Sequence, residues 1–522
     1  MNEQYLYGAA VQGIQSFIFQ TNKLREIVGA SELVEEICTI KFYEILSGKK
    51  NVDSKTASEE LINDNNCILH AAGNIKYIFE NGDECKKIVK EFPKAIFEFA
   101  PGVTVSQAVV KMEGKYAEFK DAVNELEKRL RTQRNKPMRS ATLGLMGIER
   151  SRQTGLPIVD QRKVKGEWMH VDAGTRAKLD MFKHADEPDF ELTRTLCNTA
   201  FGKEKLRSRQ IAYDIEKMTH NNDWIAIIHA DGNGLGQVVQ AIGTDEKQFK
   251  KFSESLDKAT KEAAIETYKA VKERFDEDVF IPIRPIVLGG DDFTTICRAD
   301  IALEYVTEFI KQFEEKTVFI EEYDKLKFNN LTACAGIAYI KSSYPFYYGY
   351  NLAESLCSEA KKDAKANIAD GELAKSCLMF HKVQDSFTED WSEIAKRELT
   401  PQDNISFQFG PYYINEKKED SRWTVKDLVD DVEKLGGKEG NAVKSHLRQW
   451  MSLLHDNPEM ANQKLMRLES MTSMRQYVER VTKGVKKEVK KDGEDKEITI
   501  YPVYDILAIH TINTQTTKEE KL

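Results

Sequence analysis

The chain has 522 residues, of which 41% are hydrophobic and 31% are charged, and its formal net charge is −9. That length predicts about two to four domains, and the acidic balance excludes a protein that coats nucleic acid by itself, because neutralising phosphates requires a basic surface. No apolar run approaches the roughly 20 residues that span a bilayer, and no basic leader precedes an apolar block, so we expect a cytoplasmic protein without membrane contact or strong autonomous affinity for nucleic acid.

The N-terminal part of the chain predicts an α+β unit in which strands and helices alternate. Apolar positions recur with a period of two in the strands and at helical spacing between them. The predicted elements are a strand at 5–12, a helix at 23–47, a strand–turn–strand at 67–80, a helix at 84–97, a strand at 103–112 and a helix at 116–133. Apart from its extra last helix, this order is that of a ferredoxin-like domain. Residues 134–222 then predict a connector with partial helix.

The same order of elements returns after residue 222. The predicted elements are a strand at 223–230, a helix at 245–275, strands at 281–288 and 293–298, a helix at 300–316, a strand at 331–340 and a helix at 350–367. We therefore expect two ferredoxin-like domains in one α+β chain. From about residue 371 the sequence becomes polar and helical, with helices at 423–437 and within 440–471.

The most basic stretch is "KGVKKEVKK" at 483–491, and acidic "DGED" follows it directly. Alternating charges around an Asp-Gly turn indicate a solvated hairpin. A local basic patch for nucleic acid is the alternative.

The cysteines are scattered singly and form no C-x-x-C pair. Most lie in apolar segments, which indicates small buried residues rather than disulfides or a zinc site. The eight are Cys38, Cys67, Cys85, Cys197, Cys297, Cys334, Cys357 and Cys377.

The second copy of the unit places acidic residues at its strand ends. Its first strand ends at Asp231, and "RPIVLGGDDFTTICR" (284–298) places Asp291 and Asp292 at the tip of the strand–turn–strand. Glycine and aspartate are common in turns, so a simple turn is the alternative interpretation of that tip.

The first copy keeps the turn without the acids. It has "AAGN" (71–74), with Gln12 in place of the first acid and Asn74 and Ile75 in place of the acidic pair. A turn explains glycine and asparagine in both copies, but it does not explain three acids in one. We therefore interpret the acids as functional.

Three neighbouring carboxylates remain ionised only if cations balance them. The first strand of this fold lies beside the strand–turn–strand, so Asp231 is expected next to Asp291 and Asp292. Hard oxygen ligands suit Mg²⁺ or Mn²⁺, and two such ions about 4 Å apart serve to transfer a phosphoryl or nucleotidyl group. The predicted catalytic residues are the three aspartates, and the predicted metal ligands are Asp231, Gly232, Asp291 and Asp292.

Glycine-rich segments beside the acids predict contacts with a triphosphate. In "HADGNGLGQVVQ" (229–240), glycines allow backbone amides to approach phosphate oxygens. A dinucleotide-binding loop is rejected, because an aspartate ends the strand and no ribose-binding acid follows at the expected spacing. The expected nucleotide-binding residues here are Gly232, Asn233, Gly234, Leu235, Gly236, Gly289 and Gly290.

A cation near the triphosphate is expected from the helix after the last strand. That helix offers Lys361, Lys362 and Lys365, any of which could instead serve solubility. We choose Lys361, which follows Ala360 on the flank expected to face the site. His229 looks like a metal ligand, but we expect it to face the other side of the strand in a structural role.

These motifs resemble a known family. "ADGNGLG" followed by "LGGDDF" is similar to the polymerase/cyclase palm shared with diguanylate cyclases, and more specifically to the large Cas-ten subunit of type III CRISPR effectors, the Cmr-two and Csm-one lineage. The segment 13–33, "GIQSFIFQTNKLREIVGASEL", resembles the opening of that family's first palm. Residues 336–365 resemble the last strand and helix of its second palm, so the resemblance covers roughly residues 1–400.

The resemblance implies an enzyme of antiviral defence, in which two palms face each other and hold ATP between them. The second palm would join ATP 3′ to 5′ into cyclic oligoadenylate or a cyclic dinucleotide and release pyrophosphate. The three aspartates match the family's metal-binding acids, and Ser253 matches a helix serine near the base. Gly73 and Asn74 match a turn that borders the acceptor nucleotide. The implied partners are small effector subunits and a guide or target RNA.

Two departures from the family shape the expected domains. Many members begin with an HD-type nuclease domain, whereas this sequence begins at the first palm, so we do not expect DNA cleavage by such a domain. Many also carry a cysteine-ligated zinc between the palms, and "IERSRQTGLPIVDQ" (148–161) has no cysteine, so we expect no zinc. The expected domains are a non-catalytic palm (1–133), a connector (134–222), a catalytic palm (223–370) and a mainly helical domain (371–522).

Two other functions stay open at this point. A diguanylate-type cyclase would carry a Glu where this chain has "DDF", and such enzymes pair two chains, whereas a second palm is present here. A non-catalytic scaffold subunit of an RNA-guided complex would keep the palms with vestigial acids. A complete acid set in just one copy argues against such decay.

Overall fold

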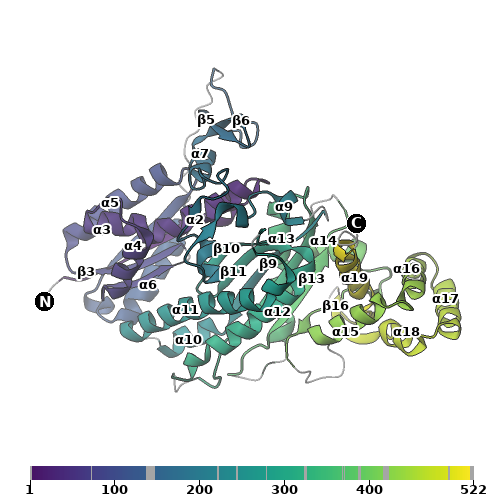
Figure 1. The fold of residues 1–522 in the computed structure, drawn as a ribbon. Helices are drawn as coiled ribbons and strands as arrows, with labels where there is room; N and C mark the ends of the chain where they lie inside the picture. The colour runs from purple at the N-terminus through teal and green to yellow at the C-terminus, as the bar shows by residue number, and fades with distance from the viewer. Residues whose placement is uncertain are drawn as a thin grey trace.

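The residues that the computed structural model describes make up most of the chain. They are 3–71, 73–136, 147–219, 223–242, 245–277, 279–322, 326–366, 368, 371–385, 390–415, 423–491 and 494–517. Figure 1 shows the purple N-terminal part beside the teal and green central part, with the yellow C-terminal helices on the far side. In the described ranges, no helix is both long enough and apolar enough to cross a membrane.

The N-terminal part contains a four-stranded antiparallel sheet. Across the sheet its strands are β2 (Cys67–Ala71), β3 (Asn74–Phe79), β1 (Tyr5–Gln12) and β4 (Thr104–Lys111). The central strand β1 is buried along almost its whole length, because helices cover both faces of the sheet.

Those helices divide between the two faces. On one face, Phe42 stacks on Tyr7 and meets Phe92 edge to face. On the other face, Gly8 lets Leu126 approach so closely that a Cβ on residue 8 would lie 2.7 Å from Leu126 Cδ2. The helices are α1 (Ile14–Ile18), α2 (Leu24–Glu36), α3 (Phe42–Ser47), which continues α2 through a π-helical turn at Ile37–Lys41, α4 (Ser54–Asn63), α5 (Gly82–Phe99) and α6 (Phe119–Arg134).

The second sheet repeats this strand order and adds two strands. Across the sheet its strands are β10 (Ile283–Gly289), β11 (Asp292–Arg298), β9 (Trp224–Asn233), β12 (Thr332–Lys341), β13 (Cys377–Lys382) and β15 (Tyr412–Tyr413). The sheet extends past the expected boundary at residue 370, because the apolar β13 pairs in parallel with β12 and continues the buried core. The chain is thus a mixed α/β protein with several sheets.

Helices cover both faces of the second sheet as well. Phe309 of one helix stacks on Phe293 of β11 with ring centroids 3.9 Å apart. On the opposite face, Gly336 receives the Ala353 carbonyl, which a Cβ on residue 336 would overlap. The helices are α10 (Leu235–Ile242), α11 (Glu246–Val271), α12 (Ala299–Lys316) and α13 (Phe346–Lys365). In the first repeat the last helix, α6, lies on the face opposite to the stacked Phe42 and Tyr7 rings. In the second repeat the last helix, α13, lies on the face opposite to the stacked Phe309 and Phe293 rings.

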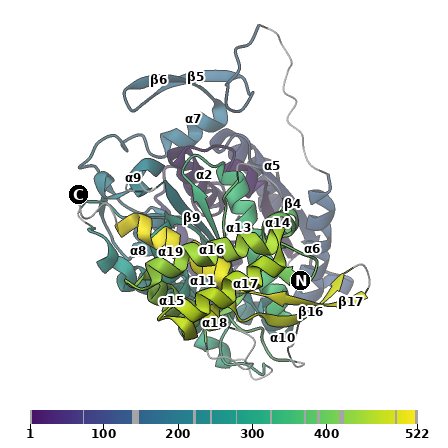
Figure 2. The same ribbon diagram turned by 90° about the vertical axis from the view of Figure 1, so that its right-hand side faces the viewer.

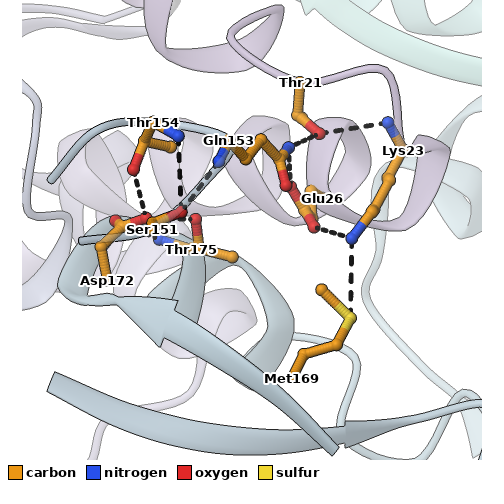
Figure 3. Close-up of polar contacts among 9 residues, drawn as sticks. All are labelled: Thr21, Lys23, Glu26, Ser151, Gln153, Thr154, Met169, Asp172 and Thr175. Atoms are coloured by element: carbon orange, nitrogen blue, oxygen red, sulfur yellow. Dashed lines mark hydrogen bonds and ion pairs between the residues drawn. The ribbon is translucent and has the colours of Figure 1, made fainter. Parts of the chain in front are cut away.

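The connector forms a hairpin that the sequence did not predict, together with short helices. The hairpin projects from the body in Figure 1. Its base is tied to α2, since Gln153 Nε2 donates to Glu26 Oε2 at 2.9 Å (Figure 3). Within the connector, Thr154 Oγ1 donates to Asp172 Oδ2 at 2.9 Å. The elements are β5 (Ile158–Val164), β6 (Glu167–Asp172), α7 (Ala173–Asp180), β7 (Glu191–Leu192), α8 (Leu196–Phe201), β8 (Leu206–Arg207) and α9 (Ile215–Thr219).

The C-terminal part combines helices with a small sheet (Figure 2). The helices are α14 (Trp391–Glu398), α15 (Val425–Gly436), α16 (Gly440–Asp456), α17 (Pro458–Met471), α18 (Arg475–Thr482) and α19 (Val503–Thr517). The sheet is formed by β14 (Ile405–Ser406), β17 (Glu494–Ile500) and β16 (Val485–Lys491). The basic stretch lies in β16, which pairs with the acidic β17, so the solvated hairpin is confirmed. All eight cysteines are free and buried, as predicted.

Candidate active site

Strand register brings the predicted acids together. Asp231 in β9 lies directly opposite Asp292, the first residue of β11. Gly289, the last residue of β10, pairs with the same Asp292 from the other side. The turn adds Asp291, whose carbonyl accepts a 3.2 Å hydrogen bond from the amide of Gly232. The acids converge because β11, which begins with one of them, is the antiparallel neighbour of the strand that carries another.

The predicted lysine lies against the acids. Lys361 Nζ forms an ion pair with Asp231 Oδ2 and donates a 3.0 Å hydrogen bond to the carbonyl of Gly232. The lysine belongs to α13, which lies close to this face of the sheet because Gly336 has no side chain. Lys361 therefore lies beside the acids, as the sequence predicted.

The acids remain short of positive charge. Burial of its carboxyl, with the charges of Asp291 and Asp231 as further causes, raises the pKa of Asp292 to about 7. Burial and the neighbouring Asp231 also raise the pKa of Asp291. In the described part of the chain, the enclosed Asp292 Oδ1 accepts no hydrogen bond. One lysine does not balance three carboxylates, so the site favours a further cation.

The donor atoms suit a divalent cation but do not form a ready-made cage. Among the residues that the structure describes, no three His, Cys, Asp or Glu side chains are arranged to hold a metal ion. Mg²⁺ prefers oxygen ligands and usually completes its shell with water and substrate phosphates. The unpartnered Asp292 Oδ1 therefore fits a metal ion that binds together with a nucleotide.

The glycines make a close backbone approach possible. Gly234 and Gly290 have φ values of +90° and +62°, which favour glycine. Gly232 has no room for a side chain, since a Cβ there would lie 2.9 Å from Asp291 Cβ. Gly236 faces open space.

The side chains of two loop residues that were expected to bind a nucleotide are engaged elsewhere in the protein. The Asn233 side chain is buried, and its Nδ2 donates to Thr332 Oγ1 at 3.1 Å and to Cys334 Sγ at 3.4 Å. Leu235 starts α10 and packs against the core. The reason is that β9 runs to residue 233, three residues beyond the predicted strand, so Asn233 lies beside β12 and its side-chain amide bonds to that strand. Only the backbone of these two residues can meet a phosphate.

The expectation that His229 faces away from the acids is wrong. Residues two apart on a strand share a face, so His229 lies on the side of Asp231. Its Nδ1 is 3.1 Å from Thr294 Oγ1 and 3.5 Å from Asp292 Oδ1. Burial lowers the pKa of His229 to about 4, so the ring is neutral at pH 7 and supplies no cation.

A cavity of about 540 Å³ lies between the two repeats; we call it the inter-repeat cavity. Asn74 lines it from the first repeat, and Gly289 and Asp292 line it from the second. Gln15 Nε2 joins its walls by donating a 2.7 Å hydrogen bond to Tyr350 Oη. The candidate catalytic residue Asp292 therefore faces a space that both repeats enclose.

The first-repeat turn has its own need for glycine. Gly73 has a φ of +77°, its carbonyl accepts a 2.8 Å hydrogen bond from Val11, and a Cβ there would lie 2.6 Å from Ile14 Cδ1. The next residue, Asn74, opens β3 and lines the inter-repeat cavity. Of this predicted pair, Asn74 is the residue that can face a ligand.

Strand register corrects the match between the repeats. Asn74 pairs with Ala10 as Asp292 pairs with Asp231. The counterpart of Asp231 is therefore Ala10 rather than Gln12, and the acidic pair corresponds to positions one residue earlier than the sequence suggested. The first repeat has no acid at any of the three positions.

Ser253 lies elsewhere, in a second cavity of about 450 Å³ that shares Gly289 with the first. One turn further along α11, Asp257 Oδ2 and Lys261 Nζ form a 2.6 Å ion pair that also lines this cavity. Sequence reasoning missed this pair, because i,i+4 ion pairs are common on solvated helices. The serine and Asn74 therefore border different spaces.

Comparisons with known proteins identify a family for the second repeat. Residues 224–369 match the family Cas10/Cmr2, second palm domain. A comparison with curated proteins gives no match.

Solved structures share the fold across almost the whole chain. A Csm1-Csm4 cassette in complex with cA4 matches with a TM-score of 0.51 and 13% identity, over 98% of this chain and 70% of that one. A cassette in complex with pppApA matches with a TM-score of 0.50 and 13% identity, over 98% and 69%. A third, in complex with one ATP, has a TM-score of 0.51 and 14% identity, over 98% and 70%.

Proposed function

We propose that this chain, whose residues 224–369 match the Cas10/Cmr2 second palm domain, is a Cas10-like nucleotidyltransferase that converts ATP into cyclic oligoadenylate in antiviral defence. The observation that carries the proposal is the register pair of Asp231 and Asp292, held against Lys361 at a cavity between two repeats. A cyclic dinucleotide is the alternative product.

The proposed domains follow the repeat. Residues 1–133 form a non-catalytic ferredoxin-like palm, and 223–370 form the core of the catalytic one, whose sheet β13 and β15 extend. Residues 134–222 connect them, and 371–522 are the C-terminal domain. The identical order of the first four strands in both sheets supports this division. Two nucleotides must meet for joining, and the two cavities that share Gly289 offer space for both.

In the proposed reaction the 3′-oxygen of one ATP attacks the α-phosphorus of another. A P–O bond forms, the bond to the β-phosphate oxygen breaks, pyrophosphate leaves, and the hydroxyl proton passes to solvent or a carboxylate. When bound, two Mg²⁺ or Mn²⁺ ions at Asp231, Asp291, Asp292 and the Gly232 carbonyl would polarise the phosphate and activate the hydroxyl. Gly289, Gly290 and the backbone of 232–236 let the triphosphate approach, and Lys361 offsets its charge.

Linear oligonucleotides with a 5′-triphosphate are the expected intermediates. A related cassette is described in complex with pppApA, and another with cA4, so a linear and a cyclic ligand are both named among the relatives. Since those relatives are cassettes with Csm4, we also propose that this chain works beside other effector subunits and a guide–target RNA.

The test is a product assay. The pure protein, alone and with a guide RNA and its complement, is incubated with Mn²⁺ or Mg²⁺ and each nucleoside triphosphate, and the products are identified by mass spectrometry. We expect cyclic adenylates and pyrophosphate, and none from the double variant Asp291→Ala, Asp292→Ala. A product that the double variant also forms would refute the site, and no product under any condition would favour a scaffold.

A further inference from the structure

The inter-repeat cavity contains a cation that no sequence motif marks. Arg134, the last residue of α6, lines it together with Asn74 and Asp292. Of the described residues that line the cavity, it is the only Lys or Arg, whereas Glu35 and Asp292 are both acidic. In the described part of the chain, Arg134 has no hydrogen bond or ion pair that occupies its guanidinium.

The position of Arg134 repeats that of Lys361. In each repeat the last helix packs on the same face of its sheet, α6 over Gly8 and α13 over Gly336. In the second repeat the C-terminal half of that helix brings Lys361 to the end of the first strand. In the first repeat the C-terminus of α6 brings Arg134 to the cavity that the end of β1 also lines. Lys361 thus pairs with Asp231, the register partner of Asp292, whereas Arg134 lines the inter-repeat cavity itself.

A helix C-terminus favours a cation whatever lies beside it, because of the helix dipole. Arg131 lies in the same last turn of α6 and satisfies that preference equally. Arg131 does not line the cavity, whereas Arg134 does. The dipole therefore explains a basic last turn but not the side chain at the cavity.

The charges of the cavity set the direction in which a nucleotide can lie. A polyphosphate is repelled by Asp292 and Glu35, and Arg134 offers a planar guanidinium that can bind phosphate through two hydrogen bonds. The hydroxyl end of the same nucleotide then faces Asp292, where the reaction takes place. Resting on the function proposed above, we propose that Arg134 determines specificity by binding the 5′-phosphates of the acceptor and so presenting its 3′-hydroxyl to the second repeat.

The test compares two acceptors that differ only at the 5′ end: pppApA and the same dinucleotide with a 5′-hydroxyl. Their affinities for the full chain are measured by calorimetry in EDTA, so that neither metal ions nor turnover contributes. The variants are Arg134→Ala, Arg134→Lys and, as the matched control, Arg131→Ala. A charge-assisted contact predicts that the wild type prefers pppApA by about 10- to 100-fold.

We expect Arg134→Ala to lose at least about tenfold of this preference by weakening pppApA alone, Arg134→Lys to keep part of it, and Arg131→Ala to keep all of it. If Arg134→Ala keeps the preference, or if the wild type has none, the inference is overturned. The assay needs no catalysis, so a preference that depends on Arg134 in a protein that makes no product would support the inference while refuting the cyclase.

Discussion

At the scale of single residues, the candidate site brings more negative than positive side chains together, and the register of the strands fixes their positions. Asp231 and Asp292 face each other across two central strands, with Asp291 at the adjoining turn. Lys361 balances part of this charge, and neutral His229 balances none. Burial raises the pKa of Asp292, and the charges of Asp291 and Asp231 raise it further.

Replacing Asp292 with Asn keeps the size of the side chain and removes its charge. We expect the rate of nucleotide joining to fall at least about 100-fold, because the substrate phosphates lose one of the groups that hold their metal ions. The measurement is the initial rate of pyrophosphate release from ATP with Mn²⁺. The control is Asp189→Asn, at a side chain that is 77% exposed. A variant as fast as wild type would contradict the assignment.

Replacing Lys361 with Met tests the cation. The charge of Lys361 lowers the pKa of Asp292, so its loss raises that pKa further. Since the carboxylate must be ionised to work, we expect the acid limb of the pH–rate profile to move to higher pH, with a rate loss of about tenfold or more. Lys362→Met is the control, because the Lys362 side chain is 73% exposed and pairs with Glu359 on the surface. A rate loss without the pH displacement would assign Lys361 a packing role.

At the scale of elements, the positions of helices depend on glycines at which two segments of the chain come into contact. Gly336 receives the Ala353 carbonyl and so seats α13, which carries Lys361. Gly29 of α2 receives the Lys178 carbonyl of α7 in the same way. The strand pairs follow apolar periodicity, but these helix positions follow from close contacts between segments far apart in sequence.

Gly336→Ala should displace α13. The added Cβ would overlap the Ala353 carbonyl, and relieving the overlap should cost about 1–3 kcal/mol of unfolding free energy. We expect a lower melting temperature by scanning fluorimetry and a slower reaction. The control for the melting temperature alone is Gly236→Ala in α10, where a Cβ meets nothing within 4 Å and alanine favours the helix. Equal melting temperatures would show that the helix adjusts freely.

A buried acid joins the second sheet to the C-terminal helices. Asp505 of α19 accepts a 2.7 Å hydrogen bond from Tyr412 of β15, and burial raises its pKa to about 7. The folded state therefore holds this proton more tightly than the unfolded state, and its contribution to stability falls as pH rises from about 4 to about 7. The melting temperature of the wild type should fall over this window relative to that of Asp505→Asn. Parallel curves would mean that the carboxyl titrates normally.

At the scale of the whole molecule, the sequence predicted the two repeated units but not the strands and the hairpin that are added to them. The pattern of apolar residues predicted all eight strands of the two repeated units, and the order of these strands predicted that the three acids lie together beside Lys361. The hairpin of β5 and β6, and the addition of β13 and β15 to the second sheet, were missed because such pairings depend on distant segments. Asn233 was misjudged because β9 runs longer than its apolar run, and Arg134 because no motif marks a helix end that faces a cavity.

The central claim is that the three acids need a divalent cation and a triphosphate to be balanced. The most direct test is to measure Mn²⁺ binding by electron paramagnetic resonance in the presence of a non-reactive ATP analogue. The comparison is between the wild type and the triple variant Asp231→Asn, Asp291→Asn, Asp292→Asn, each checked for folding by its melting temperature. We predict that a folded triple variant binds Mn²⁺ at least about tenfold more weakly. Equal Mn²⁺ affinity in both proteins would contradict the account.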